Sequence, residues 1–266
     1  MYETSYHRPS SLADAASLLA NASDGRLIAG GQTLIPTMKQ RLAAPSDLVD
    51  VAGIAEMKSI AVEGDTVSIG AACTHSDVAT SDAVRGAIPG LAELAGMIGD
   101  PAVRHRGTLG GSLANNDPAA DYPAVVLALG ATIHTDRRQI AAADFFDGMF
   151  STSLEDGEIV TRVVFPIPEK SAYAKFRNPA SGYAMAGVFV ARMKDGAVRV
   201  GVTGASGNGV FRSAEIEKAL LDSWSPAAIE PLTISAEDML SDIHGSAAYR
   251  ANLVKVMAKR AVAAIA

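Results

Sequence analysis

The sequence predicts an α+β protein: a two-part α/β domain followed by a small C-terminal domain with a three-stranded antiparallel sheet and helices. Hydrophobic residues make up 48% of the 266 residues and charged residues 20%, which is the composition of a well-packed globular chain. The first fifty residues read as a compact β-α-β-like unit, and three strand-like runs follow Pro166 and Pro168. We therefore expect a first domain over 1–170, with subdomains of about 1–55 and 56–170, and a C-terminal domain over 171–266.

The N-terminal unit alternates helices and strands. Ser10-Ser11 is a typical N-cap for a helix that ends near Asn21. Pro36 fits within the first turn of a second, short helix, where a missing N–H does no harm. The elements that we expect after the first helix are a strand over 27–29, a helix over 33–41 and a strand over 47–51.

The middle of the chain contains the strongest strand pattern, Ile159–Phe165, which Pro166 ends. Thr74 and Asp77 form a capping pattern for a helix through about Ser81. The other elements that we expect are a hairpin of strands 59–62 and 66–72, helices over 91–98 and 119–130, and strands over 131–135 and 139–141.

The C-terminal part begins at Pro166–Lys170, where prolines and a shift in charge indicate a boundary. The second of its two helices places apolar residues at spacings of three or four, as an amphipathic helix does. The elements that we expect are strands over 172–177, 185–193 and 198–204 and helices over 213–221 and 249–265.

The composition also excludes several classes of function. A net charge of −6 without a basic stripe argues against nucleic-acid binding. The N-terminus lacks the apolar core of a signal peptide, and no run approaches the roughly 18 apolar residues of a membrane span. Cys73 is the single cysteine, so this chain has no internal disulfide or thiolate cluster, and we expect a buried, inert thiol there. The five histidines are scattered without metal-site spacing, so we expect a soluble cytoplasmic chain without a metal site.

Two glycine pairs carry the clearest chemical pattern in the chain. Arg106–Asp121 contains Gly110-Gly111 between the hydroxyls of Thr108 and Ser112, and Arg26–Pro36 contains Gly30-Gly31 followed by Thr33. Glycine pairs let backbone N–H groups approach a ligand closely, and successive N–H groups form a trap for an anion. A tight structural turn is the alternative for either pair. Because two phosphate-binding turns suit a ligand with two phosphates, the pair together predicts a dinucleotide site.

The remaining polar groups do not form an acid–base centre. Arg104-His105-Arg106 is either a solvated charged face or a set of cations that balances pyrophosphate charge or meets a partner. Asp121 falls at a helix start, where it either caps free N–H groups or accepts hydrogen bonds from ligand hydroxyls. Gly204–Gly209 is interpreted as a surface loop. Turns that cradle a ligand, without catalytic machinery of their own, fit a protein whose chemistry is done by a bound cofactor.

The two glycine segments resemble the FAD loops of one family, the flavoprotein (medium) subunits of the carbon monoxide dehydrogenase and xanthine dehydrogenase superfamily. Ala29–Pro36 is similar to the first loop and Arg104–Asp121 to the second, and the likeness extends over nearly the whole chain. Leu109 stands where isoleucine or valine is usual in the family. The resemblance implies that these residues contact non-covalently bound FAD: Ala29, Gly30, Gly31, Gln32, Thr33 and Leu34 from the first loop, Thr108, Leu109, Gly110, Gly111 and Ser112 from the second, Asp121 on the sugar-alcohol chain, and Val160 and Lys175 near the isoalloxazine.

The resemblance also implies partners and a role. In this family a large subunit carries molybdopterin, a small subunit carries two iron–sulfur clusters, and electrons pass through them to the flavin and on to an external acceptor. We therefore expect an electron-transfer subunit of a molybdenum-containing dehydrogenase, assembled as a dimer of heterotrimers, with peripheral contact to membrane electron acceptors. The alternatives are a free-standing flavin-dependent oxidoreductase and a scaffold subunit that has lost its cofactor.

Overall fold

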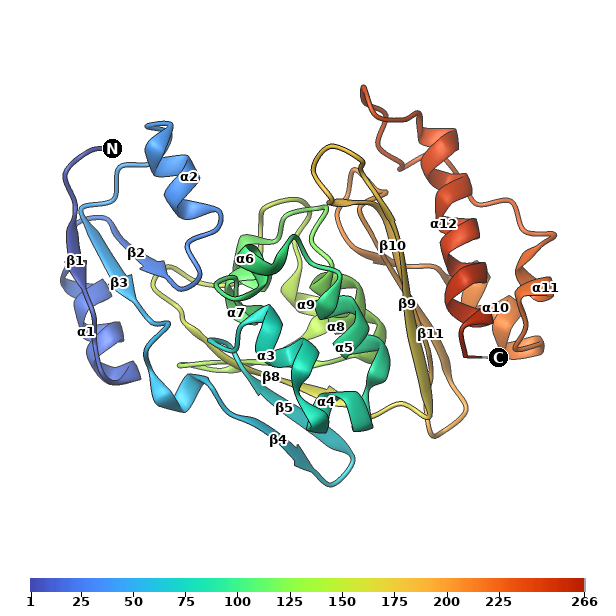
Figure 1. Cartoon of the computed structure of the whole chain (residues 1–266), viewed down its shortest axis with the longest axis horizontal. Coiled ribbons are helices and arrows are strands. Elements are labelled where there is room, and N and C mark those ends of the chain that lie inside the picture. Colours follow the sequence, from blue (N-terminus) through green and yellow to red (C-terminus); the bar gives the residue numbers. More distant parts are fainter. Residues whose placement is uncertain (266) are drawn as a thin grey trace.

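The computed structural model describes residues 1–265 and contains three β-sheets that follow one another along the molecule (Figure 1). The N-terminal sheet has three parallel strands in the order β1-β3-β2. Parallel neighbours need crossover connections, and the helices supply them, so the predicted β-α-β-like unit is confirmed. Its elements are β1 (Ser5–His7), α1 (Leu12–Asn21), β2 (Gly25–Ile28), α2 (Leu34–Lys39) and β3 (Asp47–Asp50).

Local sequence signals set the ends of these helices. Ser11 is the N-cap of α1 and its side chain accepts a hydrogen bond from the N–H of Asp14. Pro36 lies in the first turn of α2, as predicted, so its missing N–H interrupts no helical hydrogen bond. Because β2 is paired in parallel with β3, the loop between β2 and α2 starts at the carboxyl end of a parallel strand. Ligands bind at this end in sheets of this kind.

The middle sheet has five strands in the order β4-β5-β8-β6-β7, all antiparallel. Thr74 and Asp77 form the predicted capping box at the start of α3. Figure 1 shows the helices of this part gathered over one face of the sheet. The elements are η1 (Ala55–Met57), β4 (Ile60–Glu63), β5 (Thr66–Gly70), α3 (His75–Thr80), α4 (Asp82–Ala87), α5 (Pro89–Gly96), α6 (Pro101–Arg104), α7 (Leu109–Asn115), α8 (Tyr122–Leu129), β6 (Thr132–Thr135), β7 (Gln139–Ala141), α9 (Ala142–Phe145) and β8 (Val160–Pro166).

The segment after the second glycine pair differs from the prediction. We expected an irregular turn up to Pro118 and a helix over 119–130, but α7 begins at Leu109 and α8 only at Tyr122. The Thr108 hydroxyl caps α7, and Asn116, at φ 42°, ends it in the left-handed conformation. The sequence pattern did not predict α7, because Gly110 and Gly111 have low helix propensity. They nevertheless permit a short helix when a side chain caps its first turn.

The C-terminal sheet has four antiparallel strands in the order β12-β11-β10-β9, not the three that we predicted. The extra strand has only two residues, too few for any periodicity, and it is fixed by pairing with β11 and by Arg212, whose Nε donates to Glu217 at 2.8 Å. Helices α5 and α8 cover one face of this sheet and α12 the other. The elements are β9 (Lys170–Arg177), β10 (Ala184–Arg192), β11 (Val198–Thr203), β12 (Phe211–Arg212), α10 (Ala214–Asp222), α11 (Pro226–Ile229) and α12 (Ala247–Ala263).

Two large hydrophobic clusters hold these layers together. One extends from Ala15 and Val49 through the middle sheet to Phe189, and the other lies between the C-terminal sheet and α12. The first cluster therefore joins residues on both sides of positions 55 and 170, and the domain division stays a prediction. Among residues 1–265, no helix is long and apolar enough to cross a membrane.

Candidate functional site

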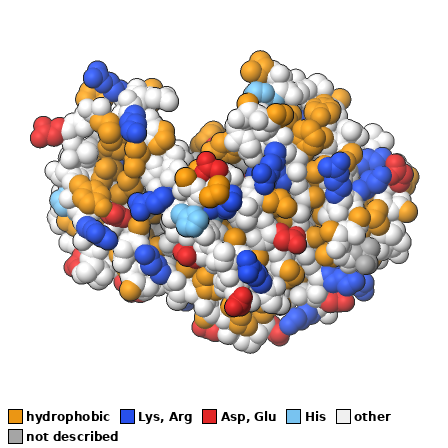
Figure 2. All heavy atoms as spheres, viewed as in Figure 1, with side chains coloured by type: hydrophobic (Ala, Val, Ile, Leu, Met, Phe, Trp, Pro, Cys, Tyr) orange, Lys and Arg blue, Asp and Glu red, His pale blue; other side chains and the backbone are white. Residues whose placement is uncertain are grey.

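A cleft of about 860 Å³ lies where the N-terminal part, the middle part and β9 meet, a volume in the range of cofactor sites. Figure 2 shows the surface hollowed between the two ends of the molecule. Of the fourteen residues that the sequence predicts as a site, the structure brings thirteen to this cleft and leaves out one, Leu109, whose side chain is fully buried in the core. The thirteen are Ala29, Gly30, Gly31, Gln32, Thr33, Leu34, Thr108, Gly110, Gly111, Ser112, Asp121, Val160 and Lys175.

The first glycine loop, Ala29–Leu34, presents free backbone donors. Among residues 1–265, no acceptor pairs with the N–H groups of residues 30 to 33, although the carbonyls of Gly31 and Thr33 accept from Ile35 and Thr37. Gly31 has φ +70°, a conformation that residues with a Cβ rarely adopt. Unpaired N–H groups that converge on a concave surface form a site for an anion.

The second glycine loop, Gly107–Ser112, uses its donors differently. The N–H of Leu109 donates to the carbonyl of Cys73 at 3.0 Å, and that of Gly110 to the carbonyl of Ala71 at 2.9 Å. The N–H of Gly111 donates to the Thr108 hydroxyl at 3.2 Å. Within the described chain, only the N–H of Thr108 in this loop has no acceptor. This loop therefore offers mainly surface and the Ser112 hydroxyl to a ligand.

The two loops touch, as a shared cleft requires. A Cβ placed on Gly30 would lie 2.3 Å from the carbonyl oxygen of Arg106 and 2.6 Å from the Cα of Gly107. Such distances are far inside van der Waals contact, so only glycine permits this approach. Two segments about 75 residues apart in sequence thus close on one space.

Asp121 anchors a buried polar cluster on the far wall of the cleft. Its carboxylate accepts hydrogen bonds from the Tyr173 hydroxyl at 2.6 Å and from Lys175 Nζ at 2.9 Å. It caps no N–H group of α8, so the capping interpretation is wrong. Burial raises the pKa of the Asp121 carboxyl, while the nearby Lys175 ammonium opposes that shift. Burial, and then the charge of Asp121, raises the pKa of Tyr173 well above its usual value, so its hydroxyl stays a donor.

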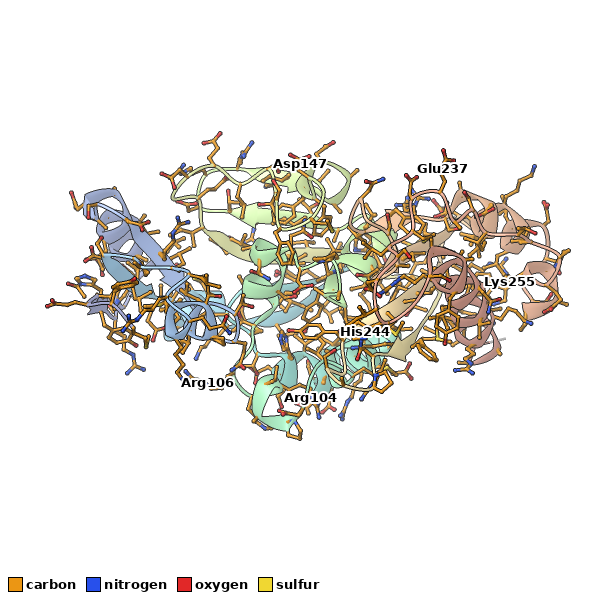
Figure 3. The ribbon with its side chains drawn as sticks, turned by 90° about the horizontal axis from the view of Figure 1, so that it is seen from above. Arg104, Arg106, Asp147, Glu237, His244 and Lys255 are labelled. Carbon is orange, nitrogen blue, oxygen red and sulfur yellow. The ribbon has the colours of Figure 1, made fainter. Side chains whose placement is uncertain are left out.

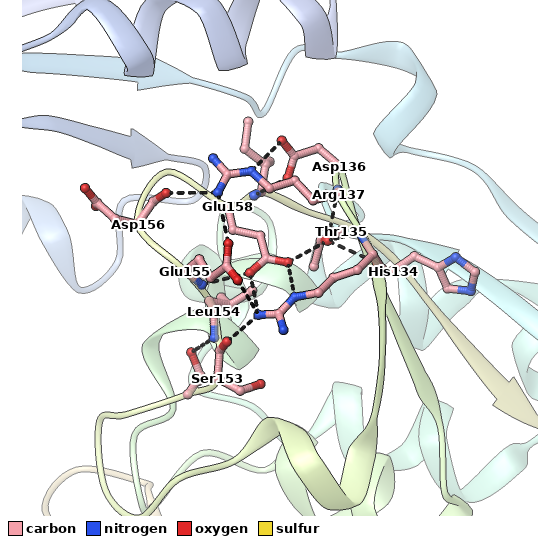
Figure 4. A network of polar contacts seen from close by, with 12 residues as sticks. His134, Thr135, Asp136, Arg137, Ser153, Leu154, Glu155, Asp156 and Glu158 are labelled. Carbon is pink, nitrogen blue, oxygen red and sulfur yellow. Dashed lines mark hydrogen bonds and ion pairs between the residues drawn. The ribbon is translucent and has the colours of Figure 1, made fainter.

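Val160 lies on the cleft wall, two residues after the buried carboxylate of Glu158. Figure 4 shows the polar contacts of Glu158 in the loop before β8. Glu158, whose side chain is fully buried, accepts two parallel bonds from Arg138, both at 2.9 Å, and one from the Thr135 hydroxyl at 2.8 Å. These hydrogen bonds, Arg138 first, lower the pKa of Glu158 to about 2 in spite of its burial. The adjoining N–H of Ile159 donates to Asp136 at 2.7 Å.

Three residues with polar groups at or beside this site were not among the predicted site residues. Glu158 and Tyr173 meet their partners only through long-range packing, so nothing near them in sequence indicates their roles. His75, whose side chain is buried on the cleft wall, follows the capping residue Thr74. The capping pattern finds the helix start but cannot tell which way the next side chain points.

The cationic run before the second loop lies outside the cleft, and Figure 3 shows Arg104 and Arg106 at one outer edge. Arg104 donates to the carbonyls of Ile98 and Gly99, and His105 bonds the carbonyl of Pro101 at 2.6 Å. The thiol of Cys73 is buried, as predicted, and burial raises its pKa to about 11, as expected of an unreactive thiol. Residues 1–265 contain no group of side chains arranged as a metal site.

Comparison with known proteins gives the family. Residues 2–168 match the model of the FAD binding domain in molybdopterin dehydrogenase. The chain is 38% identical to the nicotine 6-hydroxylase medium subunit of Paenarthrobacter nicotinovorans, over 97% of this chain and 95% of the relative. It is 35% identical to the carbon monoxide dehydrogenase medium chain of Afipia carboxidovorans, over 97% of this chain and 94% of the relative.

Comparison with solved structures gives the same family. A chain in the crystal structure of the cyanide-inactivated form of Cu,Mo-CO dehydrogenase superposes with a TM-score of 0.90 at 35% identity, over 99% of this chain and 98% of that one. A chain of quinoline 2-oxidoreductase from Pseudomonas putida 86 gives 0.88 at 32% identity, over 98% and 96%. The protein therefore belongs to the FAD-binding medium subunits of molybdenum hydroxylases of the carbon monoxide dehydrogenase and xanthine dehydrogenase type.

Proposed function

We propose that this chain binds FAD non-covalently in the cleft and passes electrons from partner iron–sulfur clusters through the flavin to an external acceptor. One observation carries the proposal: the four consecutive N–H groups of residues 30 to 33 have no acceptor within the described chain and line the cleft at the end of a parallel strand. Donors left unpaired in this way fit the diphosphate of a dinucleotide, which is anionic and rich in acceptor oxygens.

The other walls fit the rest of the cofactor. The first loop would hold the diphosphate, with Thr108 and Ser112 on its other side. Asp121 accepts hydrogen bonds and would orient the hydroxyls of the sugar-alcohol chain. Val160 offers apolar surface and Lys175 a positive charge for the isoalloxazine, which supplies the redox chemistry when FAD is bound. This chain's own residues bind the cofactor, orient it and shield it from water.

The partners follow from the family and from what the chain lacks. The relatives compared above are named as medium subunits or chains, that is, as parts of larger enzymes. The chain contains one cysteine and therefore cannot supply the several thiolates of an iron–sulfur cluster. We place molybdopterin on a large partner and the clusters on a small one, in a cytoplasmic dimer of heterotrimers with peripheral access to membrane electron acceptors.

A titration of the purified chain with FAD tests this proposal. We expect one FAD per chain, followed by flavin fluorescence and by the yellow absorption of the protein after dialysis. Gly31→Asp introduces a negative charge beside the diphosphate and should weaken binding more than a hundredfold. Gly31→Asn is the matched control, because asparagine has the same size, tolerates φ above zero and carries no charge.

Three outcomes separate the proposal from its alternatives. If the wild-type chain does not bind FAD, or if Gly31→Asp and Gly31→Asn bind it equally well, the diphosphate assignment is wrong. Turnover of a small substrate by the isolated chain with FAD would favour a free-standing oxidoreductase. A colourless chain that still assembles with the two partner subunits would favour a scaffold.

A further inference from the structure

We infer that His75 is a ligand-binding residue of the cleft, whose imidazole Nε2–H donates a hydrogen bond to a diphosphate oxygen held between the two glycine loops. This inference rests on the proposed function, because it concerns the same ligand. No resemblance or comparison assigns a role to this histidine. Three observations carry it: the place of the ring, its unpaired nitrogens and its charge.

The imidazole lies directly behind the junction of the loops. His75 is the first residue of α3, and its N–H donates to the carbonyl of Gly107 at 2.9 Å. A Cβ on Gly107 would lie 2.5 Å from His75 Nε2, and a Cβ on Gly30 would lie 2.6 Å from the Cα of Gly107. Gly107 is thus the contact between the histidine and the first loop, and the ring forms part of the cleft wall.

The ring is held in place but its polar atoms are not satisfied. Only 5% of His75 is exposed, and its ring packs against that of Tyr122 with centroids 5.4 Å apart. Neither ring nitrogen bonds any group of residues 1–265, and Nδ1 is fully buried, so Nε2 is the nitrogen that can reach a ligand. Because polar atoms in protein interiors are almost always paired, we take a ligand oxygen in the cleft to be the partner that Nε2 lacks.

The ring is neutral at physiological pH. Burial, and then the positive charge of Arg104, lowers its pKa to about 4. A neutral imidazole carries one proton, and the tautomer with that proton on Nε2 puts the donor on the nitrogen that can reach a ligand. It therefore serves as a directed donor to an anionic oxygen.

The test compares three variants with two probes, FAD and ADP, which share the diphosphate but not the flavin. His75→Phe keeps the ring and its packing on Tyr122 but removes the donor, and we expect it to weaken binding of FAD and ADP by the same factor, about ten- to a hundredfold. His75→Gln places an amide N–H near the position of Nε2 and should restore most of that loss. His105→Gln, a control on an exposed histidine outside the cleft, should bind both probes like the wild type.

The outcomes are distinguishable. Wild-type binding of FAD together with unchanged binding by His75→Phe would overturn the role of His75 and leave the proposed function standing. Failure of the wild type to bind FAD would overturn both. If His75→Phe unfolds, the wild-type chain with ¹⁵N-labelled histidine answers the question: ADP should shift the Nε2 resonance of His75, and an unmoved resonance contradicts the contact.

Discussion

The two glycine loops have similar sequences and different physical roles. In the first loop, Gly31 adopts a left-handed conformation, and the surrounding N–H groups have no acceptor in the described chain. In the second loop, Gly110 packs so closely that a Cβ there would lie 2.5 Å from the Cβ of Ala71. In the first loop Gly31 exposes backbone donors and Gly30 gives the contact with the second loop, whereas in the second loop Gly110 allows two elements of the core to touch.

The difference between the loops comes from the backbone groups that lie next to each of them. The first loop leaves the end of a parallel strand, β2, where no further strand continues the hydrogen-bond ladder. The second loop forms an isolated antiparallel bridge between Thr74 and Thr108, in which the N–H of Leu109 donates to the carbonyl of Cys73, and the next N–H, of Gly110, donates to the carbonyl of Ala71. A glycine pair therefore indicates an anion site only when its backbone donors have no partner in the fold.

The largest effect should come from the point where the loops touch. In Gly30→Ala the new Cβ would lie 2.3 Å from the carbonyl oxygen of Arg106, so the loops must separate. We expect FAD affinity to fall more than about a hundredfold and the free energy of unfolding to fall by about 2–3 kcal/mol. Fluorescence titration and urea unfolding measure the two quantities.

Gly53→Ala is the matched control for that variant. A Cβ on Gly53 would meet only the Arg8 side chain, at 3.6 Å, so both quantities should stay near the wild-type values. Normal FAD affinity in Gly30→Ala would show that the loops need not touch, and the comparison between them would lose its basis.

Smaller effects are expected in the second loop, where one glycine should matter for the stability of the fold and its neighbour for FAD affinity. Gly110→Ala forces a Cβ against Ala71 and should lower the free energy of unfolding by about 1–3 kcal/mol. In Gly111→Ala the new Cβ would lie 2.9 Å from the Thr108 hydroxyl that caps α7 and otherwise faces the cleft. The higher helix propensity of alanine offsets the weakened cap, so the free energy of unfolding of this variant should change by less than about 1 kcal/mol. Its FAD affinity should instead fall about tenfold, because the methyl group occupies ligand space.

Unfolding and FAD titration of these two variants, side by side, check the prediction. If Gly110→Ala is as stable as the wild type, the second pair does not serve packing. If Gly111→Ala destabilises the chain as much as Gly110→Ala does, the two neighbours share one structural role and neither belongs to the binding surface.

Sequence patterns predicted the parts of the fold that local periodicity encodes. The parallel N-terminal unit, the capped start of α3 and the long strand β8 follow from alternation, caps and prolines. The four-stranded C-terminal sheet could not be predicted, because a strand of two residues, Phe211–Arg212, has no period and depends on its partner strand.

In the candidate site, too, the residues of a local motif could be predicted and those placed by long-range packing could not. The glycine loops were visible because a local motif carries them. The partners of Asp121 were not, since Tyr173 lies 52 residues away and meets it only because α8 packs on the sheet that contains β9. The difference between the loops could not be predicted either, because the carbonyls of Ala71 and Cys73 that accept from the second loop belong to the turn after β5, far from that loop in sequence.

The smallest effect should come from the wall of the cleft at Glu158, where a charge rather than a glycine sets the backbone. Glu158→Gln keeps the size of the side chain but removes the charge that Arg138 and Thr135 bind. We expect the free energy of unfolding at pH 7 to fall by about 1–2 kcal/mol, because the bonds are charge-assisted but Arg138 is partly exposed. Thermal or urea unfolding measures this.

The pH dependence gives the sharper test. The pKa of Glu158 is about 2 in the folded chain, below its ordinary value of 4.5, so the carboxylate stabilises the fold above about pH 4.5. That contribution is lost as the pH falls from 4.5 toward 2, while the glutamine variant has none to lose. The difference in unfolding free energy between wild type and variant should therefore be constant from pH 5 to 7 and shrink toward zero below pH 4.5. A difference that is as large at pH 3 as at pH 7 would mean that the shape of the side chain, not its charge, fixes this wall of the cleft.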